Sequence, residues 1–149
     1  MKITIKRTII FAILATFVPA PLSAESWLCI ADMATGFKYD IASKRWQNAR
    51  FNASEQRLII KPSTNPAWQY VVVEFGKPEG FPEATCKQLP NKYGFLFCDG
   101  IFGDFKFNTL NLRYIRSYLA GYVEITPNNR LSEEGGDTPN IEIGKCSQL

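Results

Sequence analysis

Short apolar or alternating segments recur about every ten residues along this chain, and Gly, Pro, Asn and Ser separate them. This spacing is typical of β-strands joined by turns in a meander, barrel or sandwich. In one segment Val71, Val72 and Val73 follow one another, which predicts a strand buried on both faces. We therefore expect one antiparallel all-β domain, a barrel-like meander of about eight to ten strands, with a two-sheet sandwich as the alternative. The expected strands cover residues 27–32, 36–40, 45–51, 57–61, 68–75, 84–89, 95–99, 104–107 and 141–145.

Residues 110–123 fit two patterns. Leu110, Tyr114 and Tyr118 recur at the spacing of an amphipathic helix. Aromatic and β-branched residues dominate the stretch and Gly121 interrupts it, so strands are favoured over the helix. The apolar residues of this region also shift from odd to even positions after Phe107. Within one straight strand this shift would flip the buried face, so a turn or bulge is predicted around residues 108–111. The polar residues 126–140 are expected to form a long surface loop.

Residues 1–24 have the layout of a secretory signal. A basic head of Lys2, Lys6 and Arg7 precedes an apolar run, and the segment ends on the small residue Ala24. Cleavage before Glu25 would leave a single domain of residues 25–149 that is periplasmic or secreted. The apolar run is too short for a stable membrane span, so no span is expected after cleavage. No cysteine lies at the junction, so no lipid anchor is expected.

Charge and composition exclude several functions. Three of the 17 basic residues lie in the signal, so the exported chain has 14 basic and 14 acidic residues. This balance supports neither a nucleic-acid partner nor an anionic membrane through overall electrostatics, and only a local basic patch is left open. Histidine is absent, which excludes Ser-His-Asp triads, Cys-His dyads and histidine metal sites. No catalytic residue, metal or cofactor is predicted.

All four cysteines follow the signal. An even number in an exported chain of this size predicts disulfides, with three pairings open. Cys86 and Cys98 flank a predicted hairpin turn symmetrically, so antiparallel pairing would place them opposite one another. Cys29 lies in the first strand and Cys146 just after the last, so their bridge would tie the termini together in a closing sheet. Without a Cys-x-x-Cys motif, a redox or zinc site is not favoured.

Other candidate residues have simpler explanations. The tryptophans could stack on sugars. Trp27 and Trp46, however, lie among alternating apolar residues, so they are expected to pack in the core. The acidic segment 132–137 lacks the ligand spacing of a calcium loop and is expected to be a solvated loop. Asp99 and Asp104 bracket a Gly-rich turn and could present two carboxylates together, although turn chemistry also explains them.

Three exposed side chains are the binding candidates. Tyr93 is expected at the tip of the hairpin between residues 86 and 98. Arg113 and Arg116 could offer a small anionic-ligand site on an outer face. Aromatic and arginine side chains often dominate the energy of recognition surfaces.

Two end blocks, residues 27–39 and 137–146, carry the motif W-x-C-x-A-D-x-x-T-G-F … D-T-P-x-I-E-I-G-K-C. Together with Trp46, Phe51 and Cys98 they resemble a family of small exported bacterial proteins of uncharacterised function. The resemblance implies that both blocks belong to one structural unit, which agrees with a Cys29–Cys146 bridge. It implies no activity, substrate or binding residue.

The function expected from these observations is that of a non-catalytic periplasmic or secreted binding or inhibitor-type module. Its partner would be another protein or an envelope component. A carboxylate-dependent envelope enzyme and a structural envelope-assembly factor are the alternatives. A polar cleft with convergent side chains would favour a site for chemistry, and a large exposed apolar patch would favour protein binding.

Overall fold

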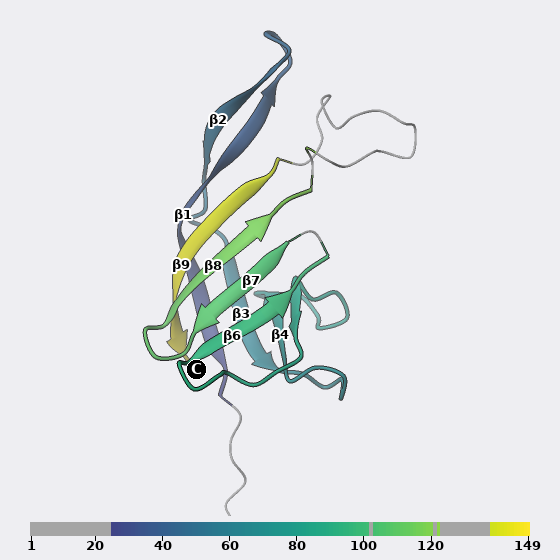
Figure 1. The fold of residues 1–149 in the computed structure, drawn as a ribbon, viewed down its shortest axis with the longest axis vertical. Coiled ribbons are helices and arrows are strands. Elements are labelled where there is room, and N and C mark those ends of the chain that lie inside the picture. The colour runs from purple at the N-terminus through teal and green to yellow at the C-terminus, as the bar shows by residue number, and fades with distance from the viewer. Residues whose placement is uncertain (1–24, 102, 121, 123–137) are drawn as a thin grey trace, which may run out of the picture.

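The computed structural model describes residues 25–101, 103–120, 122 and 138–149. These residues form no helix, and therefore none that is long and apolar enough to cross a membrane. They form one antiparallel sheet (Figure 1), which confirms the all-β prediction. Its strands are β1 (Trp27–Asp40), β2 (Arg45–Phe51), β3 (Arg57–Pro62), β4 (Tyr70–Glu74), β5 (Ala84–Cys86), β6 (Phe95–Asp99), β7 (Asp104–Asn108), β8 (Arg113–Tyr118) and β9 (Asn140–Gln148).

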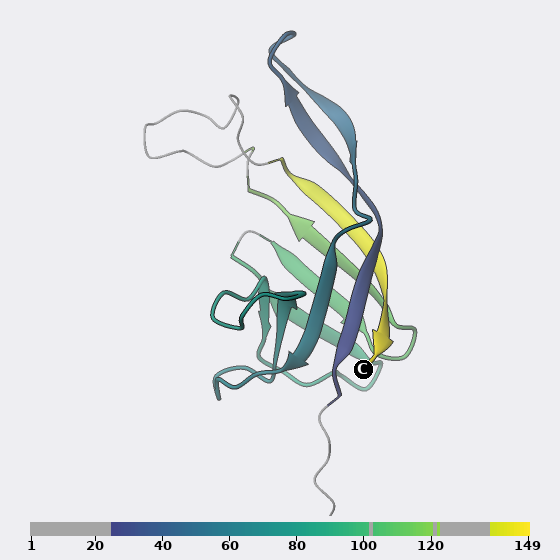
Figure 2. The ribbon, with the colours of Figure 1, turned by 180° about the vertical axis from the view of Figure 1, so that it is seen from behind.

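The sheet closes into a barrel because β1 has partners on both edges. Its first residues pair with β3 on one edge, and residues 27–36 pair with β9 on the other. Strands β1 and β3 to β9 therefore form an eight-stranded closed barrel, while β2 is an additional strand outside it (Figure 2). This closure confirms the barrel rather than the sandwich, and it places the first and last strands side by side.

Strand β1 is a single long strand where the sequence predicted two. Its register with β9 shifts between Ala31 and Met33, so Asp32 lies in a β-bulge that bends the strand without ending it. The second half of β1 continues past the barrel and pairs with β2. The hairpin of β1 and β2 projects well beyond the other strands (Figures 1 and 2).

The predicted turn at residues 108–111 is present, and it leads into a strand. The Asn108 side-chain oxygen accepts hydrogen bonds from the backbone N–H groups of Leu110 (2.9 Å) and Asn111 (3.2 Å). Leu112 then adopts a left-handed conformation with φ of 56°. The following strand β8 confirms the preference for strand over helix. Most of the expected loop 126–140, including the acidic segment 132–137, lies outside the described residues.

The barrel interior is filled with large side chains. Trp27 packs between Tyr70 and Phe107, with ring centroids 5.7 Å and 5.1 Å away. Burying each such side chain stabilises a fold by about 1.5–3 kcal/mol. Val71 and Val73 are also buried, which confirms burial on both faces of β4. The interior cluster includes Trp27, Leu58, Ile60, Tyr70, Val72, Leu96, Phe105, Phe107 and Tyr114.

Both predicted disulfides are present. Cys29–Cys146 joins β1 to β9, and Cys86–Cys98 joins β5 to β6. All four cysteines are buried in the barrel interior. Such bridges are typical of proteins outside the cytoplasm.

Trp46 does not lie in the core, which corrects the sequence prediction. It belongs to the projecting hairpin, where its ring packs against Tyr39 (5.6 Å) and Tyr122 (5.4 Å). Alternation of apolar and polar residues marks a two-faced strand, but it does not say whether the apolar face meets the barrel interior.

Candidate functional site

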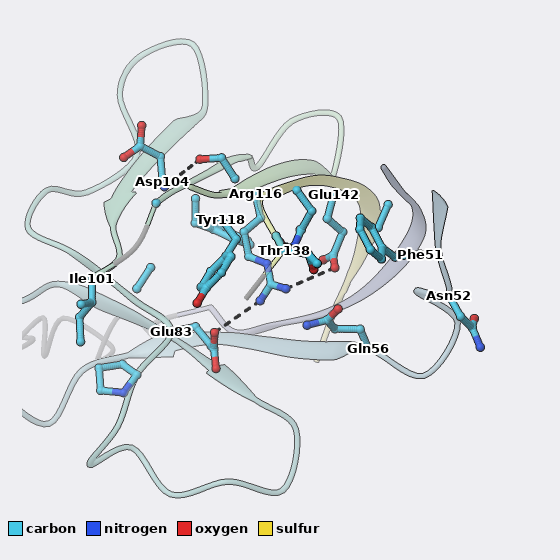
Figure 3. Close-up of a pocket in the computed structure, with 17 residues that line it drawn as sticks. Phe51, Asn52, Gln56, Glu83, Ile101, Asp104, Arg116, Tyr118, Thr138 and Glu142 are labelled. Atoms are coloured by element: carbon cyan, nitrogen blue, oxygen red, sulfur yellow. Dashed lines mark hydrogen bonds and ion pairs between the residues drawn. The ribbon is translucent and has the colours of Figure 1, made fainter. Parts of the chain in front are cut away.

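One end of the barrel opens into a polar cavity of about 540 Å³, here called the mouth pocket. Phe51, at the base of the projecting hairpin, lies on one side of it, and Ile101 and Asp104 lie on the other (Figure 3). The pocket and the hairpin are therefore at the same end of the molecule. Small-molecule sites commonly have volumes of ~300–1,000 Å³ and often lie in the mouths of barrels.

Arg116 lies at the centre of the mouth pocket. The register of β8 places it directly opposite Glu142 on β9, with both side chains turned inward. The side chain of Arg116 is 15% exposed and that of Glu142 only 1%. One guanidinium nitrogen, Nη2, lies 3.4 Å from Glu142 Oε2, and the other, Nη1, lies 3.4 Å from Glu83 Oε2. Glu83 precedes β5, three strands away from β8 around the barrel, so Arg116 spans the opening.

Gln56 bridges Arg116 and Glu142 through its side-chain amide. With its amide oriented to satisfy both neighbours, Gln56 accepts a hydrogen bond from Arg116 Nη2 at 2.6 Å and donates one to Glu142 Oε2 at 2.8 Å. Gln56 precedes β3. Side chains from separate parts of the barrel wall therefore converge on one guanidinium and separate the apolar interior from the pocket.

Tyr114 connects this polar layer to the core. Its hydroxyl donates a hydrogen bond to Glu142 Oε1 at 2.7 Å, and its ring stacks on Phe105 with centroids 5.2 Å apart. Gly144 lies opposite Tyr114 and leaves room for the ring, because a Cβ at that position would come within 2.5 Å of Tyr114 Cε1. Burial, followed by the hydrogen bond to Glu142, raises the pKa of Tyr114 well above its ordinary value of 10, so the hydroxyl stays a donor. We call Gln56, Glu83, Tyr114, Arg116 and Glu142 the mouth cluster.

The mouth cluster has unused hydrogen-bonding capacity. Arg116 Nε is buried and has no hydrogen-bond partner among the described residues. An unpaired buried donor costs about 1–3 kcal/mol, so this nitrogen marks a local cost of placing the guanidinium at the floor of the pocket. The charged side chains that face the pocket are Glu83, Arg116 and Glu142, a net charge of −1, while the side chain of Asp104 is 60% exposed on the outer face of β7. No group of three or more acidic or cysteine side chains that could hold a metal ion occurs in the described ranges.

The two arginine candidates lie on opposite faces of β8. Arg113 is exposed on the outside of the barrel, as expected. The expectation that Arg116 is also exposed there is wrong, because residues three apart on a strand point to opposite faces. Tyr93 is exposed, as expected, in the turn before β6, where Lys92 Nζ lies 4.9 Å from its ring centroid. It does not line the mouth pocket.

The register of β6 and β7 brings Asp99 and Asp104 directly opposite one another. The two carboxylates therefore approach one another, as expected from the turn that they bracket. Both side chains are exposed, so the burial that acid–base chemistry by such a pair requires is missing.

Sequence reasoning missed the other four members of the mouth cluster. One signal could have found Glu142. Cys146 must face the interior to form its bridge, and alternation along β9 then turns Glu142, four residues earlier, to the same face. A carboxylate on the inner face of a barrel strand needs a partner, which is a reason to search for an inward arginine.

Comparison with models of known protein families finds no match, and neither do comparisons with curated proteins and with solved structures. The resemblance of the end blocks to a family of small exported bacterial proteins therefore stays a prediction. Any function has to be inferred from the mouth pocket and the surface of the barrel.

Proposed function

We propose that the protein is an exported, non-catalytic binding module that holds a small, neutral, hydroxyl-rich ligand in the mouth pocket. The observation that carries this proposal is a cavity of about 540 Å³ centred on Arg116, whose lining combines hydrogen-bond donors, acceptors and aromatic rings. The expected signal of residues 1–24 and the two disulfides support a periplasmic or secreted location.

The chemistry of the lining favours a ligand that both donates and accepts hydrogen bonds. Arg116 offers donors, Glu83 offers acceptors, and Asn140 can provide both. Phe51 and Tyr118 add aromatic surface on different sides of Arg116 (Figure 3). A sugar ring matches this combination, because its hydroxyls exchange hydrogen bonds at the edges while its C–H faces pack on aromatic rings. A sugar-bearing envelope component is thus the proposed partner.

Charge argues against an anionic ligand. Two carboxylates, those of Glu83 and Glu142, and one guanidinium face the pocket, so a further negative charge would meet net repulsion in a partly desolvated site. A neutral ligand avoids this cost. Pairing of Glu83 and Glu142 with Arg116 supports binding over catalysis, because both carboxylates already have partners.

Calorimetric titration of the exported protein with sugars that differ only in charge tests the proposal. The panel consists of a methyl glycoside, an N-acetylated amino sugar, the corresponding free amino sugar and a uronic acid. We expect a neutral member to bind and the uronic acid to bind at least tenfold more weakly. Glu83→Gln should weaken binding by roughly tenfold or more, because a hydrogen bond to a charged group contributes about 1.5–3 kcal/mol.

Glu74→Gln is the matched control, since Glu74 lies outside the mouth pocket. It should leave the affinity unchanged. If no neutral sugar binds, if the uronic acid binds best, or if Glu83→Gln and Glu74→Gln behave alike, the proposed function is wrong.

A further inference from the structure

The projecting hairpin is a separate structural feature, here called the arm and defined as residues 37–50. The last residue pair between β1 and β9 is Gly36 with Asn140, so beyond it only β2 continues the sheet beside β1. Asp40 holds the end of the arm together. Its carboxylate accepts hydrogen bonds from the Ala42 N–H (3.1 Å), the Ser43 hydroxyl (2.6 Å) and the Gln47 amide (3.0 Å). The arm thus ends in an ordered turn that reaches beyond the barrel (Figures 1 and 2).

The arm carries a concentrated positive charge. The arm contains four exposed cations and one acidic residue, Asp40, which gives it a net charge of +3. None of these cations has an ion-pair partner among the residues that the structure describes. Since the exported chain is neutral overall, the rest of it carries −3. The cations are Lys38, Lys44, Arg45 and Arg50.

Apolar and aromatic side chains accompany this charge. Ile41 lies in the turn at the tip and is 67% exposed, and Phe37 on β1 is 53% exposed. Trp46 and Tyr39 form an edge-to-face pair just behind the turn. An apolar tip, adjacent cations and a following aromatic pair match the order in which a bilayer presents its acyl boundary, phosphates and interfacial region.

We propose that the arm docks tip-first on the surface of a bilayer that contains anionic phospholipids. Ile41 enters the boundary between headgroups and acyl chains, while Lys38, Lys44 and Arg45 pair with lipid phosphates. Each basic residue near such a surface strengthens binding, and the negative remainder of the protein turns the arm toward it. This proposal does not depend on the ligand of the mouth pocket.

The distribution of the cations favours a bilayer over an acidic protein. Alternation along the strands places Lys38 and Arg45 on one face of the arm and Arg50 on the other, with Lys44 in the turn. A protein that packed on the face of Lys38 and Arg45 would leave the exposed apolar tip at Ile41 uncovered. Tip-first docking brings Lys38, Lys44 and Arg45 to the phosphates together.

Sedimentation of the exported protein with lipid vesicles tests the proposal. We expect binding to vesicles that contain phosphatidylglycerol, little binding to pure phosphatidylcholine, and loss of binding at high salt, because exposed charges are screened there. The fluorescence of Trp46 should shift to shorter wavelength on binding, and Trp46→Phe should remove that shift. The double variant Lys44→Glu/Arg45→Glu should bind ~tenfold or more weakly.

Lys87→Glu/Lys92→Glu is the matched control, because it changes the net charge equally at exposed positions outside the arm. It should bind vesicles like the unmodified protein, with both variants keeping their thermal unfolding midpoint. Ile41→Asp, at unchanged fold, should weaken binding as well. Absence of vesicle binding, equal binding to both lipid compositions, equal losses in the two double variants, or capture of an acidic protein in place of vesicles would overturn the proposal.

Discussion

Arg116 and Glu142 lie directly opposite one another on the inner faces of β8 and β9, and their pairing closes one end of an otherwise apolar barrel. Taking two charges out of water is costly, and a well-packed apolar pair of similar volume is often at least as stable. A buried ion pair at the floor of an open pocket is therefore better explained by recognition than by stability. Its partners Gln56 and Tyr114 hold Glu142 in place.

The pair should be sensitive to removal of one member. Arg116→Met leaves the buried carboxylate of Glu142 without its cation, so we expect the free energy of unfolding to fall by about 3 kcal/mol. Arg113→Met, on the outer face of the same strand, should change it by less than ~0.5 kcal/mol. Urea unfolding followed by circular dichroism measures both. Equal effects of the two substitutions would show that Arg116 is not paired inside the barrel.

Alkaline pH should weaken the fold through Tyr114. Its pKa in the folded state lies above the ordinary value of 10, so the folded protein keeps a proton that the unfolded chain releases. The contribution is complete below pH 10 and is lost as the pH rises above it. Tyr114→Phe should lower the free energy of unfolding at neutral pH by about 2 kcal/mol and make its decline above pH 10 less steep. Tyr93→Phe, at an exposed position, should do neither.

Acid should weaken the fold through Glu79. Hydrogen bonds led by the Thr64 N–H (2.8 Å), with the Lys61 contact at 3.1 Å, lower the pKa of Glu79 from 4.5 to about 2. A lowered folded-state pKa contributes stability above pH 4.5 that is lost as the pH falls toward 2. Stability curves of Glu79→Gln should therefore be flatter over this range than those of the unmodified protein. A curve of unchanged slope would contradict the assignment, and Glu74→Gln serves as the control.

The two disulfides should resist reduction until the barrel opens. Cys29 and Cys86 are fully buried, so a thiol reductant reaches neither bridge in the folded state. Loop-entropy reasoning gives ~3 kcal/mol for the 12-residue separation and ~4–5 kcal/mol for the 117-residue one. Replacing Cys29 and Cys146 by Ala should thus destabilise the protein more than replacing Cys86 and Cys98. Thiol labelling with and without denaturant checks the protection, and rapid labelling without denaturant would refute it.

The strands and disulfides were predictable because they depend on local patterns. Alternation identified β2, β6 and the turn after Asn108, and the symmetric spacing of Cys86 and Cys98 about one turn implied their bridge. The pairing of Cys29 with Cys146 followed from the closure of a meander on itself. These inferences needed only the periodicity of a strand and the antiparallel order of neighbours.

The mouth cluster was not predictable in the same way. Gln56, Glu83 and Arg116 are far apart in the sequence and meet only because the barrel closes. Their inward orientation depends on strand register, which composition does not report. The arm was not predictable for a related reason. The bulge at Asp32 joins two predicted strands into one continuous strand, and this strand extends past the barrel and forms the hairpin.

Nuclear magnetic resonance of the ¹⁵N-labelled protein tests the central claim most directly. The probe is a titration with a neutral N-acetylated amino sugar, followed through backbone amides and the Nε–H signal of Arg116. We predict saturable shifts at Gln56, Glu83, Arg116 and Glu142, including that Nε–H signal, while Tyr93 and the residues of the arm stay unchanged. Saturable shifts confined to the outer wall or the arm, with the mouth cluster unmoved, would contradict the assignment of the mouth pocket as the binding site.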